Sequence, residues 1–283
     1  MIPSAPFLNN AARTVATLAL ALVIGHASCA ARAEPVLRIG VVPWRPAEAL
    51  RQLYRPTLEL LARQLGADTE LHIAGDFSEL SRMVSEGRVD MAFFGPTSYV
   101  IAKRRDPGLR YLATCRLPED HFFSLVIVPK DSTLQKLADA RGRSLGLSDK
   151  QSTSGYVMPR ALFERAGVRI EQDTRVYLLG RHARVFEAMA KGAIQVGAVA
   201  STDWEAGVAA HGDRFRVIAR SAPIPLDPVA AAPHVSTKVA ARIQAALARA
   251  EHDAAFTLMG GELKGYSVRS DAFYDAIREL ALP

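Results

Sequence analysis

The sequence predicts an α/β fold built from two lobes, and three observations support this fold class. Strand-like and helix-like segments alternate over residues 36–104 in the order βαβαβ. The same alternation returns over residues 123–209. Proline then occupies three of the six positions 223–228, which excludes a helix there. Alternation of this kind is typical of mostly parallel sheets with right-handed crossovers, in which ligands bind beyond the carboxyl ends of the strands.

The proline-rich segment determines how we divide the chain. It is an extended return segment, so two strands cross between the lobes, one leading out and one leading back. We therefore expect lobe 1 at residues 34–122 plus 224–283 and lobe 2 at residues 123–223. Two crossings form a hinge, which allows the lobes to close over a ligand in the cleft between them.

Apolar runs and helical spacing define the elements of the first series. Leu50, Leu53 and Leu61 fall at helical spacing, and the helix ends at Gly66. The expected order is strand 36–42, helix 50–65, strand 71–73, helix 77–86, strand 89–94 and helix 100–104. The loop 95–99 lies at the carboxyl end of a strand, so Thr97 and Tyr99 are candidate anion-facing residues.

The second series begins with a buried strand. Residues 122–129 are apolar without alternation, which is typical of a strand buried on both faces. The elements expected after it are helix 134–140, strand 144–147, a helix ending at Arg165, strand 176–179, helix 183–191, strand 194–200, helix 202–209 and strand 215–220. Helical patterns over residues 239–250, 254–258 and 272–281 close the chain.

Three hydroxyl side chains and a glycine, Ser152-Thr153-Ser154-Gly155, stand where a helix follows strand 144–147. A helix start has up to four N–H groups without partners and roughly half a positive charge, so it attracts anions. The hydroxyl groups add neutral donors, which suit a tetrahedral oxyanion such as phosphate or phosphonate. Serine and threonine are also the commonest helix caps, so the string alone leaves a purely capping role open.

Three further polar residues are candidates, each with a structural alternative. His182 follows a strand end, where its imidazole could donate to an oxyanion or simply face solvent. Asp203 follows strand 194–200, where it is either a helix cap or a carboxylate in the cleft. Asp227 precedes Pro228, and Asp-Pro commonly opens a turn.

The N-terminal segment predicts export from the cytoplasm. Residues 15–24 form an apolar run too short to span a bilayer, with no acid before them and small residues after them. We expect a signal peptide at residues 1–33, cleavage before Glu34 and a periplasmic protein. Lipidation at Cys29 is a weaker alternative, because His26 stands where a lipobox has an aliphatic residue.

Composition argues against several classes of function. Removal of residues 1–33 leaves 283 − 33 = 250 residues, and the loss of two arginines and no acid lowers the net charge from +6 to +4. This excess is mild and contains no Lys/Arg block, so nucleic acid is not an expected partner. Cys115 would then be the single cysteine, which excludes an intrachain disulfide. Zinc-helix, nucleophile-elbow and phosphate-loop motifs are absent from the sequence, so we expect no metal, no cofactor and no enzyme.

Four strings together resemble one family of binding proteins. They are residues 89–99, 152–159, 180–182 and 224–228, and the most specific is Ser-Thr-Ser-Gly with a proline four residues after the glycine. Over roughly residues 36–260 the chain resembles the phosphate/phosphite/phosphonate substrate-binding proteins of ABC transporters. This resemblance implies the type 2 periplasmic binding protein fold, in which two α/β lobes joined by two crossing strands enclose a ligand cleft.

The resemblance also implies a set of ligand-binding residues. The positions that hold the phosphonate oxygens in the family correspond here to Ser152, Thr153, Ser154 and His182. In an aminoalkylphosphonate binder, acidic positions face the ammonium group of the ligand. These positions correspond here to Asp227 and, less directly, to Thr202 or Asp203. Phe77 and Phe122 stand where phosphonate binders have tyrosines, and a phenyl ring lacks the hydroxyl donor. The ligand is therefore expected to be smaller or less charged, or to carry a substituent that packs on the rings.

By this resemblance we expect a monomeric extracytoplasmic protein that captures a phosphonate, phosphite or phosphate for the permease of an ABC importer. A second class stays open, because the same lobes can serve as the ligand-sensing partner of a membrane sensor kinase. A hydrolase that uses Ser154, His182 and Asp203 is a less favoured third reading.

Overall fold

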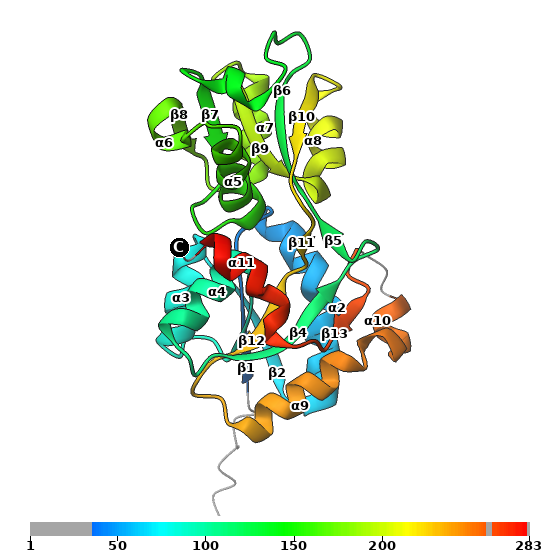
Figure 1. The fold of residues 1–283 in the computed structure, drawn as a ribbon. Helices are drawn as coiled ribbons and strands as arrows, with labels where there is room; N and C mark the ends of the chain where they lie inside the picture. Colours follow the sequence, from blue (N-terminus) through cyan, green and yellow to red (C-terminus); the bar gives the residue numbers. More distant parts are fainter. Residues whose placement is uncertain (1–35, 259–261, 282–283) are drawn as a thin grey trace, which may run out of the picture. The chain divides into compact units, whose positions relative to one another are not determined.

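The computed structural model describes residues 36–258 and 262–281 (Figure 1). The predicted signal peptide, its cleavage before Glu34 and the alternative of lipidation at Cys29 lie outside the described residues. Two sheets and one short two-stranded ladder hold the described strands. We call residues 36–122 and 224–281 the first half, and residues 123–223 the second half.

The sheet of the first half has six strands in the order β13-β4-β12-β3-β1-β2. Its strands are β1 (Val36–Val41), β2 (Asp68–Ile73), β3 (Met91–Phe93), β4 (Arg110–Arg116), β12 (Pro228–Ala231) and β13 (Gly265–Ser267). Strand β1 pairs in parallel with β2 and β3, whereas β12 and β4 make antiparallel pairs. The expectation of a mostly parallel sheet is therefore wrong here, because the returning strand β12 enters the middle and the unpredicted strands β4 and β13 add to it.

The sheet of the second half has five strands in the order β10-β6-β9-β7-β8. Its strands are β6 (Ser124–Pro129), β7 (Ser144–Leu147), β8 (Arg175–Leu178), β9 (Val196–Ala200) and β10 (Phe215–Arg220). Strand β7 pairs in parallel with β8 and β9, and β6 pairs antiparallel with β9 and β10. The carboxyl ends of β7 and β9 therefore lie at one edge, next to the segments that begin at Ser148 and Ser201.

The chain passes between the two sheets twice, as the proline-rich segment predicted. The two crossings pair as a short antiparallel ladder of β5 (His121–Phe122) and β11 (Ile224–Pro225), with Ile224 opposite Phe122 (Figure 1). The sequence predicted one strand over residues 122–129. The structure divides it into β5 and β6, because the chain leaves one sheet and enters another at Phe123.

The helices largely follow the predicted periodicity. They are α2 (Ala47–Leu65), α3 (Phe77–Ser85), α4 (Pro96–Arg105), α5 (Met158–Arg165), α6 (Ile170–Asp173), α7 (His182–Ala190), α8 (Trp204–His211), α9 (Thr237–Ala248), α10 (Ala254–Leu258) and α11 (Asp275–Ala281). Helix α2 ends at Gly66, whose φ of 63° is the left-handed conformation that glycine adopts without steric cost. The expected helix 134–140 is only a 3₁₀ turn, η1 (Leu137–Ala140). Three further 3₁₀ turns are η3 (Ser201–Asp203), η4 (Ala250–His252) and η5 (Asp271–Tyr274).

Helix α4 begins four residues earlier than predicted. Gly95 is its extended N-cap and Pro96 its first residue, a position where the missing N–H of proline costs nothing. Thr97 and Tyr99 therefore lie in the first turn of a helix and not in a loop.

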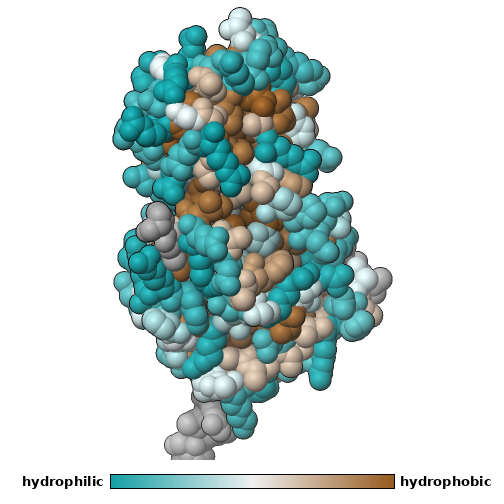
Figure 2. All heavy atoms as spheres, in the orientation of Figure 1, coloured by the Kyte–Doolittle hydropathy of each residue, from teal (hydrophilic) through white to brown (hydrophobic). Residues whose placement is uncertain are grey.

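Apolar side chains form separate cores in the two halves. One cluster surrounds the first sheet and includes Ile39, Leu61 and Phe93, while Val126 and Phe163 belong to a cluster on one face of the second sheet. A third cluster covers the other face of that sheet. The cores meet in one place, because Met158 of α5 belongs to the core of the first half and Leu280 packs against both cores. Elsewhere the junction leaves room for a cavity, and apolar residues reach the surface near the middle of the molecule (Figure 2).

The hydroxyl-rich string forms a single turn of π-helix, η2 (Thr153–Val157), that runs directly into α5. The N–H of Met158 donates to the carbonyl of Thr153, five residues back. Pro159 follows without an N–H, so it cannot donate to the carbonyl of Ser154 or Gly155. Neighbouring strands supply these donors instead, namely Ser124 Oγ to the Ser154 carbonyl at 2.6 Å and the Ser148 N–H to the Gly155 carbonyl at 3.1 Å. Pro159 is therefore compatible with this helix start because its missing bonds are replaced from outside.

Substituting Ser124→Ala tests this replacement. The change leaves the buried carbonyl of Ser154 without a donor, which should lower the free energy of unfolding by about 1–3 kcal/mol in urea denaturation. Ser85→Ala is the matched control, because Ser85 Oγ also donates to a carbonyl, that of Arg82 at 3.0 Å, but at an exposed site. Equal stability of the two variants would contradict the assignment.

Candidate functional site

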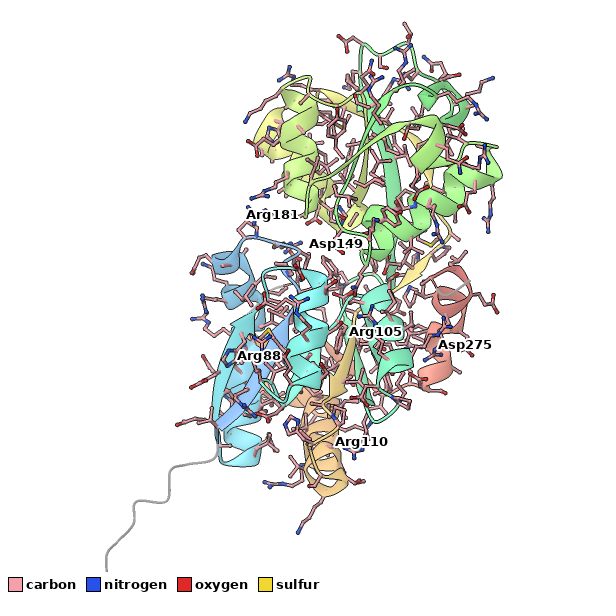
Figure 3. All side chains as sticks on the ribbon, turned by 90° about the vertical axis from the view of Figure 1, so that its left-hand side faces the viewer. Arg88, Arg105, Arg110, Asp149, Arg181 and Asp275 are labelled. Atoms are coloured by element: carbon pink, nitrogen blue, oxygen red, sulfur yellow. The ribbon has the colours of Figure 1, made fainter. Side chains whose placement is uncertain are left out.

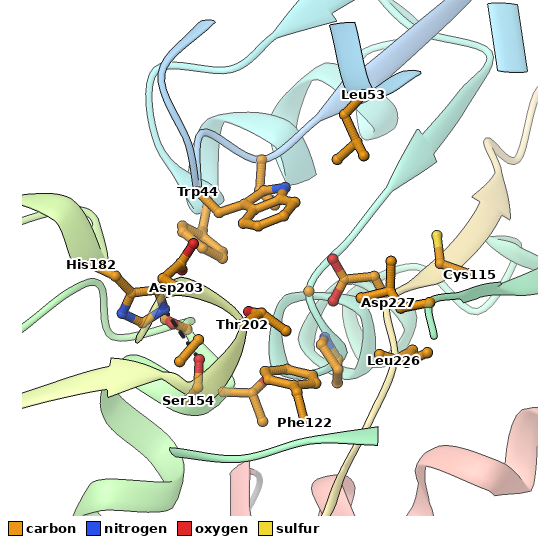
Figure 4. Close-up of a pocket in the computed structure, with 18 of the residues that line it drawn as sticks. Trp44, Leu53, Cys115, Phe122, Ser154, His182, Thr202, Asp203, Leu226 and Asp227 are labelled. Carbon is orange, nitrogen blue, oxygen red and sulfur yellow. Dashed lines mark hydrogen bonds between the residues drawn. The ribbon is translucent and has the colours of Figure 1, made fainter. Parts of the chain in front are cut away.

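A cavity of about 80 Å³ lies between the two halves, where strands of both sheets end (Figure 4). The second half contributes its polar lining residues, which are Ser152, Thr153, Ser154, His182, Thr202 and Asp203. The first half contributes Asp227 and an apolar wall that includes Leu53, Leu117, Phe122, Leu226 and Leu263. Phe77 also lines the cavity, so the structure brings nine of the residues named from the sequence to one place.

Ser154 and His182 are hydrogen-bonded to each other in the polar wall. Ser154 Oγ lies 3.2 Å from His182 Nε2, and both residues are buried (Figure 4). His182 is the first residue of α7 and not, as predicted, a loop residue. Burial lowers the pKa of its imidazole, against the opposing effect of the Asp203 charge. When Nε2 of the neutral imidazole carries the hydrogen, it donates to Ser154 Oγ. The hydroxyl hydrogen of Ser154 is then available as a neutral donor to a ligand.

Hydrogen bonds hold the start of η2 both within its own half and to the first half. Ser152 Oγ accepts from the N–H of Gly155 at 3.1 Å, and Thr153 Oγ1 accepts from the N–H of Thr97 in the first half at 2.9 Å. The hydroxyl hydrogen of Thr153 is then free to donate to a ligand, because the oxygen has already used one acceptor position.

Gly155, Thr97 and Tyr99 do not line the cavity. The N–H of Gly155 is engaged by the Ser152 cap, and a Cβ at this position would lie 1.6 Å from Ser148 Oγ. Gly155 therefore permits close packing of the turn and is not a free donor. Thr97 contacts the site only through the hydrogen bond from its N–H to Thr153 Oγ1. The hydroxyl group of Tyr99 is hydrogen-bonded to Asp271.

Two carboxyl groups face the cavity in different surroundings. Asp203 Oδ1 lies 3.4 Å from Nε of Arg45 in the first half, while its buried Oδ2 has no partner among the described residues. Asp227 is half-buried, and burial, together with the charge of Asp203, raises its pKa to about 7. A group with this pKa exists in both protonation states near neutral pH. Asp227 can therefore accept a hydrogen bond from a ligand or donate one to it.

Several lining residues were missed by the sequence reading. They include Trp44, Tyr54, Leu117 and Leu263, none of which is among the predicted site residues. Trp44 follows β1, so the rule that ligands bind beyond the carboxyl ends of strands could have found it. Leu117 follows β4 directly, and β4 itself was not predicted.

The polar wall lies at the face of the second half that meets the first half. Figure 3 shows Asp149, after β7, and Arg181, before α7, at this junction. Among the described contacts, Arg45 is the cation nearest to the cavity carboxylates. Its guanidinium group contacts both Asp203 and Glu262, and Nη1 lies 2.9 Å from Oε2 of Glu262. The donors that face the cavity are therefore mostly neutral, which suits an anion of low charge.

The site lacks the full arrangement of a hydrolytic triad. His182 Nδ1 has no hydrogen-bond partner among the described residues, so Asp203 does not orient the imidazole. Also within the described residues, no group of three or more metal-ligating side chains is found, and no helix is long and apolar enough to cross a bilayer.

Comparison with known proteins identifies the family. The model for "ABC transporter, phosphonate, periplasmic substrate-binding protein" matches residues 39–273. The chain therefore belongs to this extracytoplasmic family, and the resemblance noted in the sequence is confirmed. PhnD1 from Prochlorococcus marinus, solved in complex with methylphosphonate, has a TM-score of 0.78 at 17% identity and covers 87% of this chain and 96% of its own. Such similarity confirms the type 2 periplasmic binding protein fold.

Two curated relatives differ in the role that their names give. The tetrathionate sensor histidine kinase TtrS of Salmonella typhimurium is 27% identical over 266 residues, which is 86% of this chain and 44% of TtrS. The phosphate-import protein PhnD of Mycolicibacterium smegmatis is 25% identical over 169 residues, which is 54% of this chain and 52% of PhnD. The chain thus spans about half the length of the curated relatives it matches.

The raised pKa of Asp227 predicts a pH-dependent stability. Between its ordinary value of 3.8 and about 7, the unfolded carboxyl group loses its proton while the folded one keeps it, so stability falls as pH rises through this window. Asp227→Asn removes this effect. The unfolding free energy of the wild type relative to Asp227→Asn should therefore fall by up to about 1.4 kcal/mol per pH unit in the window.

Urea denaturation of both proteins at a series of pH values measures this difference. Asp68→Asn at an exposed position is the control, and its difference from the wild type should stay constant. A constant difference for Asp227→Asn as well would show that Asp227 titrates normally in the folded protein.

Proposed function

We propose that this protein is the solute-binding component of an ABC importer and captures a phosphorus oxyanion in the cavity between its halves. The bonded pair of Ser154 and His182, buried at the end of the second sheet, carries this proposal. Neutral donors that are held in place before binding lose little entropy when the ligand arrives. Phosphonate, phosphite and phosphate are all candidate ligands of such a site.

We further propose that the two halves are lobes that close on the ligand, with the chain divided between residues 122 and 123 and between residues 223 and 224. Bonds across the junction support this division. Thr97 donates to Thr153, Gln151 Nε2 donates to Ser78 Oγ at 2.6 Å, and Arg45 contacts Asp203. Arg160 Nη2 also donates across the junction, to the Leu280 carbonyl at 3.0 Å. These few polar contacts can break and re-form with the hinge at β5 and β11, while most of each core lies within one half and stays intact.

A signalling role is the second candidate function. The similarity to TtrS extends over 86% of this chain, compared with 54% for PhnD of Mycolicibacterium smegmatis. In this role the same closure would be read by a membrane sensor kinase in place of a permease. In both roles we propose a monomer that catalyses no reaction. For the second point, Asp203 makes no hydrogen bond to His182 Nδ1 among the described residues.

Thr153→Val tests the site itself. The change keeps the shape of the side chain but removes one donor and releases the bond to Thr97, which should weaken binding of methylphosphonate, phosphite or phosphate by about 1–3 kcal/mol, or roughly 5- to 150-fold. Isothermal titration calorimetry measures the change. Thr237→Val, at an exposed helix start, is the control. Unchanged affinity for a ligand that the wild type binds would count against this site.

Growth experiments separate import from signalling. A strain that lacks the gene should fail to grow on methylphosphonate, phosphite or limiting phosphate as the sole phosphorus source if the protein serves an importer. Wild-type protein should restore growth and Thr153→Val should restore it poorly. Normal growth and uptake, combined with loss of a ligand-dependent transcriptional response, would favour the sensor role.

A further inference from the structure

The cavity has two acids in its lining but no permanent cation. Its described lining residues include Asp203 and Asp227, and none of them is a lysine or an arginine. Burial lowers the pKa of the His182 imidazole, so this lining group is mostly neutral at pH 7. An anion that enters the cavity therefore meets neutral donors and two carboxyl groups.

Asp203 has a cation beside it. Its Oδ1 lies 3.4 Å from Nε of Arg45, whose guanidinium group also contacts Glu262, so one cation is shared between two carboxylates. An adjacent cation stabilises the charged form of an acid. The buried Oδ2 of Asp203 has no partner among the described residues, so a negative charge remains at the cavity.

Asp227 has no such cation. Among the described contacts no donor reaches its carboxyl group, and burial with the charge of Asp203 raises its pKa to about 7. The N–H of Cys115 donates to the Asp227 carbonyl at 2.9 Å, which holds this residue in place beside β4. Figure 4 shows its carboxyl group in the cavity, on the other side from Ser154 and His182.

The titratable groups packed near Asp227 from other elements of the first half are neutral. They are Tyr54 of α2, Cys115 of β4 and Tyr274 of η5, and burial raises the pKa of each. The indole N–H of Trp44, which also lines the cavity, is neutral by nature. None of these groups can offset a second negative charge beside an anion. Protonation of Asp227 removes that charge and converts its carboxyl group from an acceptor into a donor.

From this arrangement of charges we infer that Asp227 takes up a proton when the anion binds and donates it in a hydrogen bond to a ligand oxygen. The proton comes from the solvent and stays on the carboxyl group, so the ligand keeps its own charge. The inference rests on the proposed oxyanion site and adds a donor that exists only in the neutral form of Asp227. Because the charged form repels the anion, affinity should fall as the pH rises.

Isothermal titration calorimetry with methylphosphonate, in buffers of different ionisation enthalpy, counts the protons taken up. Asp227→Asn is the comparison, because its amide keeps a neutral donor but cannot titrate. The free carboxyl group is mostly charged at pH 8, so the wild type should take up about 0.4–0.8 proton more than Asp227→Asn there, and only about 0.1 more at pH 6. Proton uptake by the ligand itself occurs in both proteins and cancels in this difference.

The affinities provide a second measurement. The association constant of the wild type relative to that of Asp227→Asn should fall about five- to tenfold between pH 6 and pH 8. Asp227→Leu, which offers no donor, should bind about 2- to 12-fold more weakly than Asp227→Asn. Asp68→Asn, at an exposed position outside the cavity, is the matched control and should follow the wild type at both pH values.

Three results would overturn the inference while the proposed function stands. Equal proton uptake by the wild type and Asp227→Asn at pH 8 would place the proton on the ligand. A constant affinity ratio would show that Asp227 does not respond to the anion. Release of protons by the wild type relative to Asp227→Asn would mean that the charged carboxylate binds the ligand. Failure of methylphosphonate, phosphite and phosphate to bind the wild type at either pH would instead reject the proposed function.

Discussion

The helix start at residues 152–158 is the constraint on which the site depends. Its backbone is wound as one π turn, and Pro159 removes the donor that would continue that pattern. Because Ser124 and Ser148 supply the missing bonds from the second sheet, the turn is fixed to that sheet. In this arrangement Gly155 allows close packing of the turn and does not offer its N–H to a ligand. The same arrangement leaves the hydroxyl groups of Thr153 and Ser154 at the cavity, where a ligand can use them.

The two halves contribute to the cavity in different ways. The second half supplies small neutral donors at the ends of its strands, and the first half supplies rings and aliphatic side chains anchored in its core. Few polar contacts cross the junction, and two of them, Thr97 to Thr153 and Arg45 to Asp203, reach residues of the site itself. The proposed closure would therefore act on the same side chains as ligand binding, which would couple the ligand to the shape of the protein.

The sequence predicted the parts of the fold that depend on local pattern. Alternating segments revealed the two series, and the proline-rich return at residues 223–228 revealed the crossings. The sequence analysis failed where long-range pairing decides the outcome. Short strands such as β13 carry almost no local signal, and β12 makes the first sheet mixed by pairing antiparallel with β3 and β4. The polar side of the site was recognisable from the string at residues 152–155 and from family resemblance. The apolar side was not, because Leu117 and Leu263 look like ordinary core residues until the fold brings them together.

A crystal structure of the protein with methylphosphonate is the most direct test of this account. The account predicts phosphonate oxygens within hydrogen-bonding distance of Ser154 Oγ, Thr153 Oγ1 and His182 Nε2. A phosphonate group bound on the first half, or a ligand outside the cavity with the hydroxyl groups of residues 153 and 154 still facing only protein, would contradict it.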